Sequence, residues 1–191
     1  RQKIVVGRAE RIDRRSVTIS PMGVIVLALL LVLPLGAAGL EERARQYLAD
    51  IIRLDTTNPP GNEIKAAQFF KEIFDREGIE ARIIESAPGR GNIYARLRGD
   101  GSRKPVLLAS HGDTVGVEKE KWTVDPFGGV TQEGHLLGRG AIDFKGGIAV
   151  FARAVMMLAE QKVPLARDVI FLIEADEEAA QYNTSWLARD H

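Results

Sequence analysis

The sequence predicts an α/β fold, in which helices cover a central sheet. Two short, wholly apolar runs, 106–109 and 169–173, are typical of central strands that are buried on both faces. Between them, residues 146–161 form a long apolar stretch with helical spacing, which is long enough to cover one face of the sheet. Since helices and strands alternate along the chain, we expect a three-layer sandwich with a mainly parallel central sheet.

The elements before the first central strand follow the same logic. Apolar spacing predicts helices over 40–54 and 63–78, and the prolines and glycine within 55–61 end the first of them. Residues 79–85 and 92–98 alternate apolar and polar side chains or are rich in strand formers, so we expect two strands there.

Composition narrows the function classes. The chain has 191 residues, a length that suits one domain or one and a fraction. It has 26 basic and 26 acidic side chains, and 45% of its residues are hydrophobic. The balanced charge argues against a general nucleic-acid role. The chain contains no cysteine, which excludes disulfides, a cysteine nucleophile and thiolate metal sites. A bound metal would therefore need His, Asp or Glu ligands.

The N-terminal residues have the layout of a targeting segment. Residues 1–15 carry six Lys/Arg and two Asp/Glu, a local charge of 6 − 2 = +4, and residues 16–40 carry no charge. Small residues at 36–39 suit a signal peptidase, and Pro34 within a short apolar core favours cleavage. A membrane anchor is the alternative, because the uncharged stretch approaches the ~20 residues that span a bilayer. We expect residues 1–39 to direct export, giving a secreted or periplasmic protein, or else a membrane-anchored one.

Both ends of the sequence suggest a piece of a longer protein. The first residue is Arg1 rather than Met, and residues 184–191 have the pattern of an amphipathic helix without a stop signal. We therefore expect further chain beyond His191.

Polar side chains follow three predicted strands. His111 and Asp113 come after the first apolar run, and Asp143 comes after the short strand expected at 135–137. Because sites in open α/β sheets form beyond the carboxyl ends of strands, we expect loops leaving three neighbouring strands to converge. The second apolar run is followed by four acids within five residues: Glu174, Asp176, Glu177 and Glu178.

Each group has a metal-binding and a purely structural interpretation. In an extended segment His111 and Asp113 point to the same side, so the carboxylate can orient the imidazole and leave its other nitrogen for a metal, or the pair can simply close a turn. Asp143 lies between glycine pairs that let the backbone bend, but it could also be the N-cap of the next helix.

The acidic cluster likewise has two interpretations. Asp176 could cap a helix whose first turn contains Glu177 and Glu178, each stabilised by ~0.3–1 kcal/mol at the helix dipole. That account does not explain why the acids follow directly on a buried strand, where clustered carboxylates repel one another. A divalent cation with His and carboxylate ligands would remove the repulsion.

Together these motifs resemble a known enzyme family. Residues 111–115, 138–147 and 176–178, with Trp122 between them, are similar in order and content to the dinuclear zinc peptidases and deacylases. That family includes aminoacylase, carboxypeptidase S, glutamate carboxypeptidase, acetylornithine deacetylase and succinyl-diaminopimelate desuccinylase. The turn at 55–63 also resembles the family's opening turn, so the resemblance covers residues 40–191. It implies that these residues are the incomplete, N-terminal part of a catalytic domain.

The resemblance assigns a role to each residue. His111 would bind one zinc ion, Glu178 would bind the second, and Asp143 would bridge both. Glu177 would be the general base that deprotonates the bridging water, and Asp113 would orient His111. Two Zn²⁺ ions are implied, and Co²⁺ or Mn²⁺ would also suit this ligand set.

The implied activity is hydrolysis of amide bonds in small peptides or N-acyl amino acids, as in carboxypeptidases and aminoacylases. The family also has a further acidic ligand, a histidine and a lid or dimerisation domain downstream. We therefore expect the present chain to be inactive alone and the full-length protein to form a homodimer. The alternative is a non-catalytic exported module that retains the fold and binds a ligand or partner. A magnesium-dependent phosphoryl-transfer enzyme would have no use for His111, and the chain lacks the P-loop spacing.

Overall fold

The structure is a computed structural model that describes residues 39–179 and 181–190. The predicted targeting segment, apart from its last residue, and the terminal His191 lie outside the described residues. Within the described part, no helix has both the length and the apolar character needed to cross a membrane.

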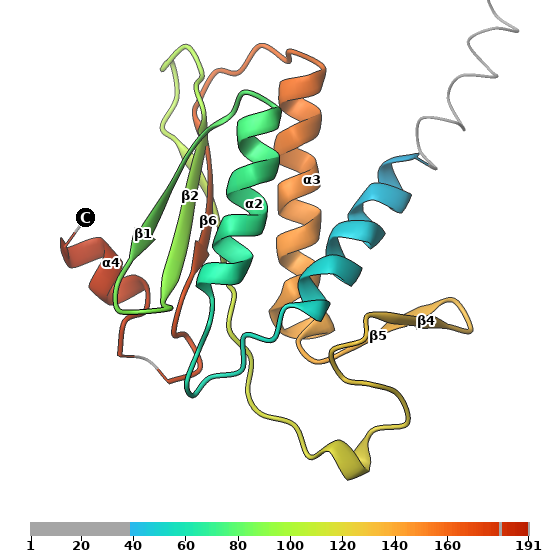
Figure 1. Ribbon diagram of the computed structural model, residues 1–191. Helices are drawn as coiled ribbons and strands as arrows, with labels where there is room; N and C mark the ends of the chain where they lie inside the picture. Colours follow the sequence, from blue (N-terminus) through green and yellow to red (C-terminus); the bar gives the residue numbers. More distant parts are fainter. Residues whose placement is uncertain (1–38, 180, 191) are drawn as a thin grey trace, which may run out of the picture. The chain divides into compact units, whose positions relative to one another are not determined.

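The central sheet has four described strands in the order β1-β2-β6-β3 (Figure 1). β1 pairs with β2 and β2 with β6 in antiparallel fashion, whereas β3 and β6 are parallel. The strands are β1 (Glu80–Glu85), β2 (Gly91–Leu97), β3 (Val106–His111) and β6 (Val169–Glu174).

The α/β class is confirmed, but the described sheet is mixed rather than mainly parallel. Residues 86–90 connect β1 to β2, and such a short connection permits only an antiparallel pair. Only β3 and β6 are separated by a helical crossover, α3 (Gly146–Glu160), which parallel pairing requires. The register of β3 and β6 places His111 opposite Glu174, so both strands end at the same edge of the sheet.

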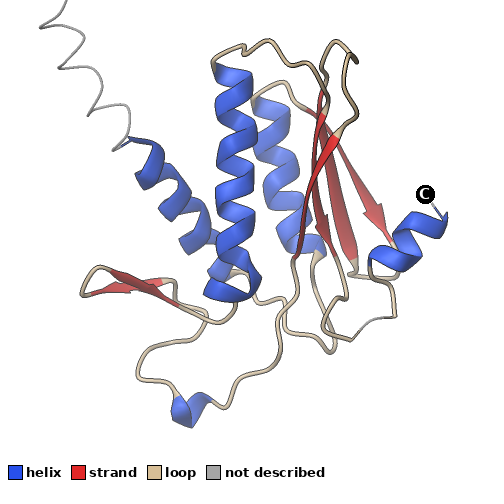
Figure 2. Ribbon diagram, turned by 180° about the vertical axis from the view of Figure 1, so that it is seen from behind, coloured by secondary structure: helices blue, strands red, loops and turns tan. Residues whose placement is uncertain are grey.

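Helices lie on both sides of the sheet, as a three-layer arrangement requires. Figures 1 and 2 show α2 (Ile64–Arg76) and α3 on one side and the short α4 (Thr184–Asp190) on the other. The core lies under α2 and α3, where Phe70, Phe74 and Phe171 are fully buried. Burial of each ring contributes about 1.5–3 kcal/mol. On β3 the other face is open, and Leu107 is 52% exposed.

The first predicted helix and the strand predicted at 135–137 are both present. The first predicted helix is present at residues 39–53, within one residue of its expected bounds. The strand expected at 135–137 is also present as β5 (His135–Leu137), but it pairs only with β4 (Val130–Gln132). These strands form a hairpin outside the central sheet, closed by Glu133 and Gly134 with positive φ angles (52° and 78°). The expectation that Asp143 follows a third strand of the central sheet is therefore wrong.

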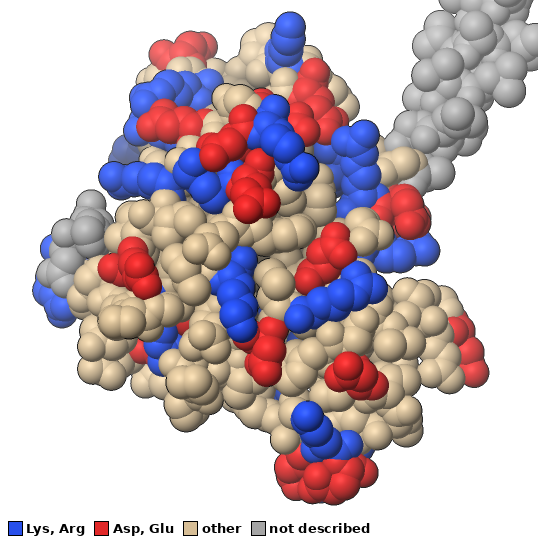
Figure 3. Space-filling view, viewed as in Figure 1, with Lys and Arg blue, Asp and Glu red and all other residues tan. Residues whose placement is uncertain are grey.

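Charged side chains of both signs are interspersed over one face of the molecule. Figure 3 shows no continuous basic area on that face.

Candidate metal site

The carboxyl end of β3 places His111 beside Asp113. The Gly112 N–H donates to the Glu174 carbonyl (2.9 Å), so the two parallel strands stay together just past their ends. His111 Nδ1 lies 3.2 Å from Asp113 Oδ1, and both side chains are buried. The carboxylate therefore orients the imidazole and leaves Nε2 facing outward, as the two-residue spacing predicts.

Asp143 reaches the same place from the segment between β5 and α3. Its Oδ1 lies 3.0 Å from His111 Nε2, and its side chain is 78% exposed. Gly140 allows this approach, because it has a φ of 78° and a Cβ there would lie 2.5 Å from Thr114 Cγ2. The N-cap residue of α3 is Lys145, so the alternative N-cap role of Asp143 is wrong. A glycine turn, rather than a third central strand, delivers this carboxylate.

The acids after β6 lie in a turn and do not open a helix. The next helix, α4, begins only at Thr184, so the helix-start interpretation is wrong. Backbone N–H groups of Glu177 and Glu178 donate to Asp113, at 3.2 and 3.0 Å. Asp113 thus orients His111 with one oxygen while both of its oxygens hold the turn after β6.

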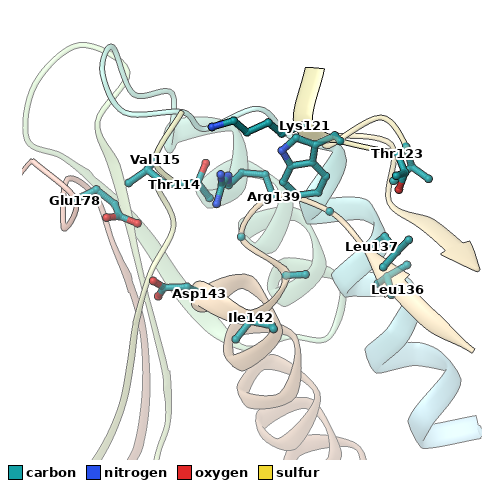
Figure 4. A pocket seen from close by; sticks show the side chains of 15 residues that line it. Thr114, Val115, Lys121, Thr123, Leu136, Leu137, Arg139, Ile142, Asp143 and Glu178 are labelled. Carbon is teal, nitrogen blue, oxygen red and sulfur yellow. The ribbon is translucent and has the colours of Figure 1, made fainter. Parts of the chain in front are cut away.

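The three predicted metal ligands converge. One donor atom from each of His111, Asp143 and Glu178 can be chosen so that all three lie within 4.8 Å of one another. Figure 4 shows the carboxylates of Asp143 and Glu178 facing the same space. Glu177, the predicted base, is exposed and stands outside this trio. Asp113 is not one of the three residues; it is fully buried and contacts His111.

The electrostatics of the trio favour a bound cation. Burial lowers the pKa of His111, but hydrogen bonds to Asp113 and Asp143 outweigh burial and raise it to about 9. Burial raises the pKa of Glu178; the charge of His111 opposes this shift, and the neighbouring carboxylates of Asp113, Asp143 and Glu177 add to it. His111 therefore retains a proton that a divalent cation would displace.

Comparison with known proteins identifies the family to which this chain is related. The model of peptidase family M20/M25/M40 matches residues 107–190, which include all five predicted site residues. A probable succinyl-diaminopimelate desuccinylase of Staphylococcus aureus is 35% identical over 150 residues, covering 78% of this chain and 36% of that protein. A succinyl-diaminopimelate desuccinylase of Methylobacterium nodulans is 44% identical over 140 residues, covering 70% of this chain and 34% of that protein. The chain belongs to the M20 peptidase family.

A solved structure supports the fold of this M20 chain. An M20 family metallo-carboxypeptidase from Sulfolobus solfataricus superimposes with a TM-score of 0.65 at 23% identity, covering 74% of this chain and 33% of that one. The M20 chain thus spans about a third of the length of the relatives that it matches.

Behind the trio, Asn58 joins two buried carboxylates. It is 5% exposed, and its Nδ2 donates to Asp113 Oδ2 and to Asp176 Oδ1, each at 2.8 Å. Its Oδ1 accepts a hydrogen bond from Arg90 (2.7 Å), which also pairs with Asp176 (2.9 Å) and with the fully buried Glu63. Asn58 therefore links the turn that follows the first helix to both loops of the site.

Sequence reasoning gave no role to Asn58, Glu63 or Arg90. The available signal was an arginine between two glycines, Gly89 and Gly91, in the β1–β2 connection. A charged side chain in so short a loop does not reveal that it turns inward.

Lys145 is a further residue that sequence reasoning missed. It is fully buried, and its Nζ donates to the carbonyls of Ile51 and Leu54 at 2.9 and 2.8 Å, at the end of the first helix. Burial lowers its pKa to about 8. Lys145 thereby fastens the turn that carries Asp143 to the helix over 39–53.

A cavity of about 430 Å³ opens beside the trio (Figure 4). Asp143 and Glu178 contribute to its lining, together with Trp122 and Arg139 from two separate segments. Its position next to the metal-ligand candidates makes it the natural place for a substrate.

Proposed function

We propose that the full-length protein is a metal-dependent hydrolase that cleaves an amide bond in small peptides or N-acyl amino acids. The observation that carries this proposal is the convergence of His111, Asp143 and Glu178 to within 4.8 Å, next to a cavity. The relatives named as desuccinylases and as a metallo-carboxypeptidase support the same reaction class, since each of those names describes cleavage of an amide.

The residues fit a divalent metal. An imidazole nitrogen and two carboxylate oxygens form the donor set that Zn²⁺ accepts, and Asp113 holds the imidazole in the tautomer that leaves Nε2 available. Two carboxylates facing one space repel each other, which is consistent with the raised pKa of Glu178. We propose that His111, Asp143 and Glu178 would hold two Zn²⁺ ions, with Asp143 as a ligand to both. The two metal ions would lower the pKa of a water molecule and polarise the scissile carbonyl.

We propose that Glu177 moves the proton. Its side chain is exposed, it lies outside the trio, and its charge is close enough to His111 to raise the pKa of the imidazole. From this position Glu177 can accept a proton from the attacking water and pass it to the leaving amine. The Glu177 backbone N–H donates a hydrogen bond to the Asp113 carboxylate. Asp113 therefore positions both the imidazole of His111 and the proposed base, Glu177.

The decisive experiment measures metal content and amide hydrolysis together. The full-length protein is stripped with a chelator, reloaded with Zn²⁺, Co²⁺ or Mn²⁺, and assayed on a panel of dipeptides and N-acyl amino acids. We expect metal to bind and hydrolysis to return with it. Metal binding without hydrolysis of any panel member would favour the non-catalytic module, and failure to bind metal would refute the site.

We further propose that residues 1–39 direct export of the protein to the periplasm or the medium, with retention as a membrane anchor as the alternative. The support is the charge pattern of the sequence. N-terminal sequencing of the protein recovered outside the cytoplasm tests this: a new terminus near residue 40 is expected, and a protein confined to the cytoplasm would contradict it.

A further inference from the structure

Arg90 supplies the positive charge of the buried network that Asn58 joins. Its side chain is only 12% exposed, and its Nη1 pairs with Glu63 (2.5 Å) while its Nη2 pairs with Asp176 (2.9 Å). Both carboxylates are fully buried, and neither forms another ion pair among residues 39–179 and 181–190. An uncompensated buried charge is strongly destabilising, so the two carboxylates depend on Arg90.

Asp176 fixes the shape of the loop over residues 176–182, which we call the acidic loop. Its Oδ2 accepts hydrogen bonds from the backbone N–H groups of Gln181 (2.8 Å) and Tyr182 (2.7 Å). Because these contacts close the loop onto its first residue, the position of Asp176 sets the position of the residues between. Those residues include the proposed base and one of the three proposed metal ligands.

Arg90 reaches the acidic loop by two routes. In the first, it pairs with the Asp176 carboxylate and with Glu63, whose Oε1 also accepts a hydrogen bond from the Asp176 N–H (3.2 Å). In the second, it donates to Asn58, which donates to Asp113, and the two Asp113 oxygens accept backbone N–H groups of the loop. Within the described part of the chain, no hydrogen bond or ion pair joins Arg90 to the trio. Its effect on the trio therefore passes through the loop.

The surrounding backbone is shaped to receive this guanidinium. Gly61 has a φ of 79°, and a Cβ at this position would overlap the Arg90 guanidinium. The Arg90 backbone is also held, because its N–H donates to the Ala87 carbonyl (2.8 Å) and its carbonyl accepts from the Ser86 N–H (3.0 Å). Arg90 is thus fixed at both ends, as a side chain that holds a loop in place must be.

We propose that Arg90 is a positioning residue: by holding Asp176, it places the acidic loop so that the base meets the attacking water and the ligand meets the metal. The inference rests on the proposed hydrolytic function and adds a residue to it. Without the guanidinium, Asp176 and Glu63 would be buried unpaired, and the loop would move until Asp176 found water or another donor. A displacement of about 1 Å in a reacting group can lower turnover about 100-fold.

The first test compares the wild-type full-length protein with Arg90→Gln, each loaded with Co²⁺, whose visible absorption reports the geometry of its ligands. We expect a changed spectrum at full loading and dissociation constants for Co²⁺ and Zn²⁺ that rise about 10- to 100-fold. With Zn²⁺ bound, kcat should fall about 10- to 100-fold while KM stays within about 3-fold. A residue that only stabilised the fold would move none of these values in folded, fully loaded protein. A wild-type spectrum with wild-type metal affinity would overturn the proposal.

Two control variants separate the position of Arg90 from its charge. Arg98→Gln removes an arginine from an exposed pair with Glu80 and should leave the spectrum, the metal affinity and kcat unchanged. Arg90→Lys keeps the charge without the planar fork, so it should restore part of the loss. If Arg90→Gln fails to fold, Arg90→Lys provides the test: kcat and metal affinity should each fall about 2- to 10-fold, and wild-type values would overturn the proposal.

Hydrogen exchange in the metal-free protein makes the inference independent of metal binding and turnover. If the wild type binds no metal or hydrolyses nothing, the proposed function fails, but the amides of the acidic loop still report on its position. Four of them donate to Asp113 or Asp176, those of Glu177, Glu178, Gln181 and Tyr182. These amides should exchange about tenfold faster or more in Arg90→Gln than in Arg98→Gln, and their increase should exceed that of the β6 amides. An increase no larger than that of β6 would overturn the proposal.

Discussion

Replacing Asn58 with alanine should loosen both loops of the metal site at once. The wild-type amide separates Asp113 from Asp176 and donates to each at 2.8 Å in a buried setting. Alanine removes both donors and leaves two carboxylates facing a cavity, and it also removes the acceptor for Arg90.

The size of the effect follows from these contacts. A hydrogen bond to a charged group contributes about 1.5–3 kcal/mol, so the loss of two gives about 3–6 kcal/mol. Arg90 keeps its contact with Asp176 at 2.9 Å, which places the expected loss at the lower end, about 3 kcal/mol of unfolding free energy. Asp113 also holds the turn of Glu177 and Glu178, so metal affinity should fall together with stability.

Urea unfolding followed by tryptophan fluorescence measures the stability change, and calorimetry with Zn²⁺ measures the affinity. The matched control is Asn62→Ala, four residues along the chain, whose side chain makes none of the described hydrogen bonds and should change stability by less than about 0.5 kcal/mol. If Asn58→Ala behaves like Asn62→Ala, the amide does not hold the two carboxylates and the reasoning fails.

Other consequences concern single residues of the site. Glu177→Gln in the full-length protein should abolish turnover while metal content stays near normal, and wild-type turnover would show that Glu177 is not the base. Asp143→Ala should lose metal, which elemental analysis detects; retained stoichiometry would contradict its place among the ligands. In metal-free protein, His111 has a folded-state pKa of about 9 against 6.5 for the ordinary group, so its stabilising effect is complete below about pH 6.5 and disappears as the pH rises through 9. The difference in unfolding free energy between wild type and His111→Asn should therefore shrink by about 3 kcal/mol over this range, and a flat profile would refute it. Because bound metal displaces that proton, zinc affinity should rise with pH up to about 9, by at most tenfold per unit.

The local part of the metal site was predictable from the sequence. The spacing of His111 and Asp113 in an extended segment fixes their relative orientation, and an apolar strand followed by acids places those acids at the sheet edge. The two parallel strands β3 and β6 then bring both groups together, so these contacts needed only strand direction and side-chain period.

The remaining features depend on contacts between distant segments. The direction of β2 relative to β6 is not encoded in either run of side chains, and the route of Asp143 depends on a hairpin that packs outside the sheet. Asn58 and Arg90 meet across 32 positions because a glycine at 61, where a Cβ would overlap the guanidinium, leaves room for Arg90. Such pairings follow from tertiary packing, which periodicity does not contain.

The position of β3 has a practical consequence. Among the described strands it borders the sheet, with β6 on one flank only, and Leu107 on its open face is 52% exposed. An edge strand with unpaired backbone N–H and C=O groups and an exposed leucine can pair with a strand of another polypeptide. Preparations of the 191-residue chain by itself should therefore self-associate as concentration rises, and sedimentation at several loadings would reveal it.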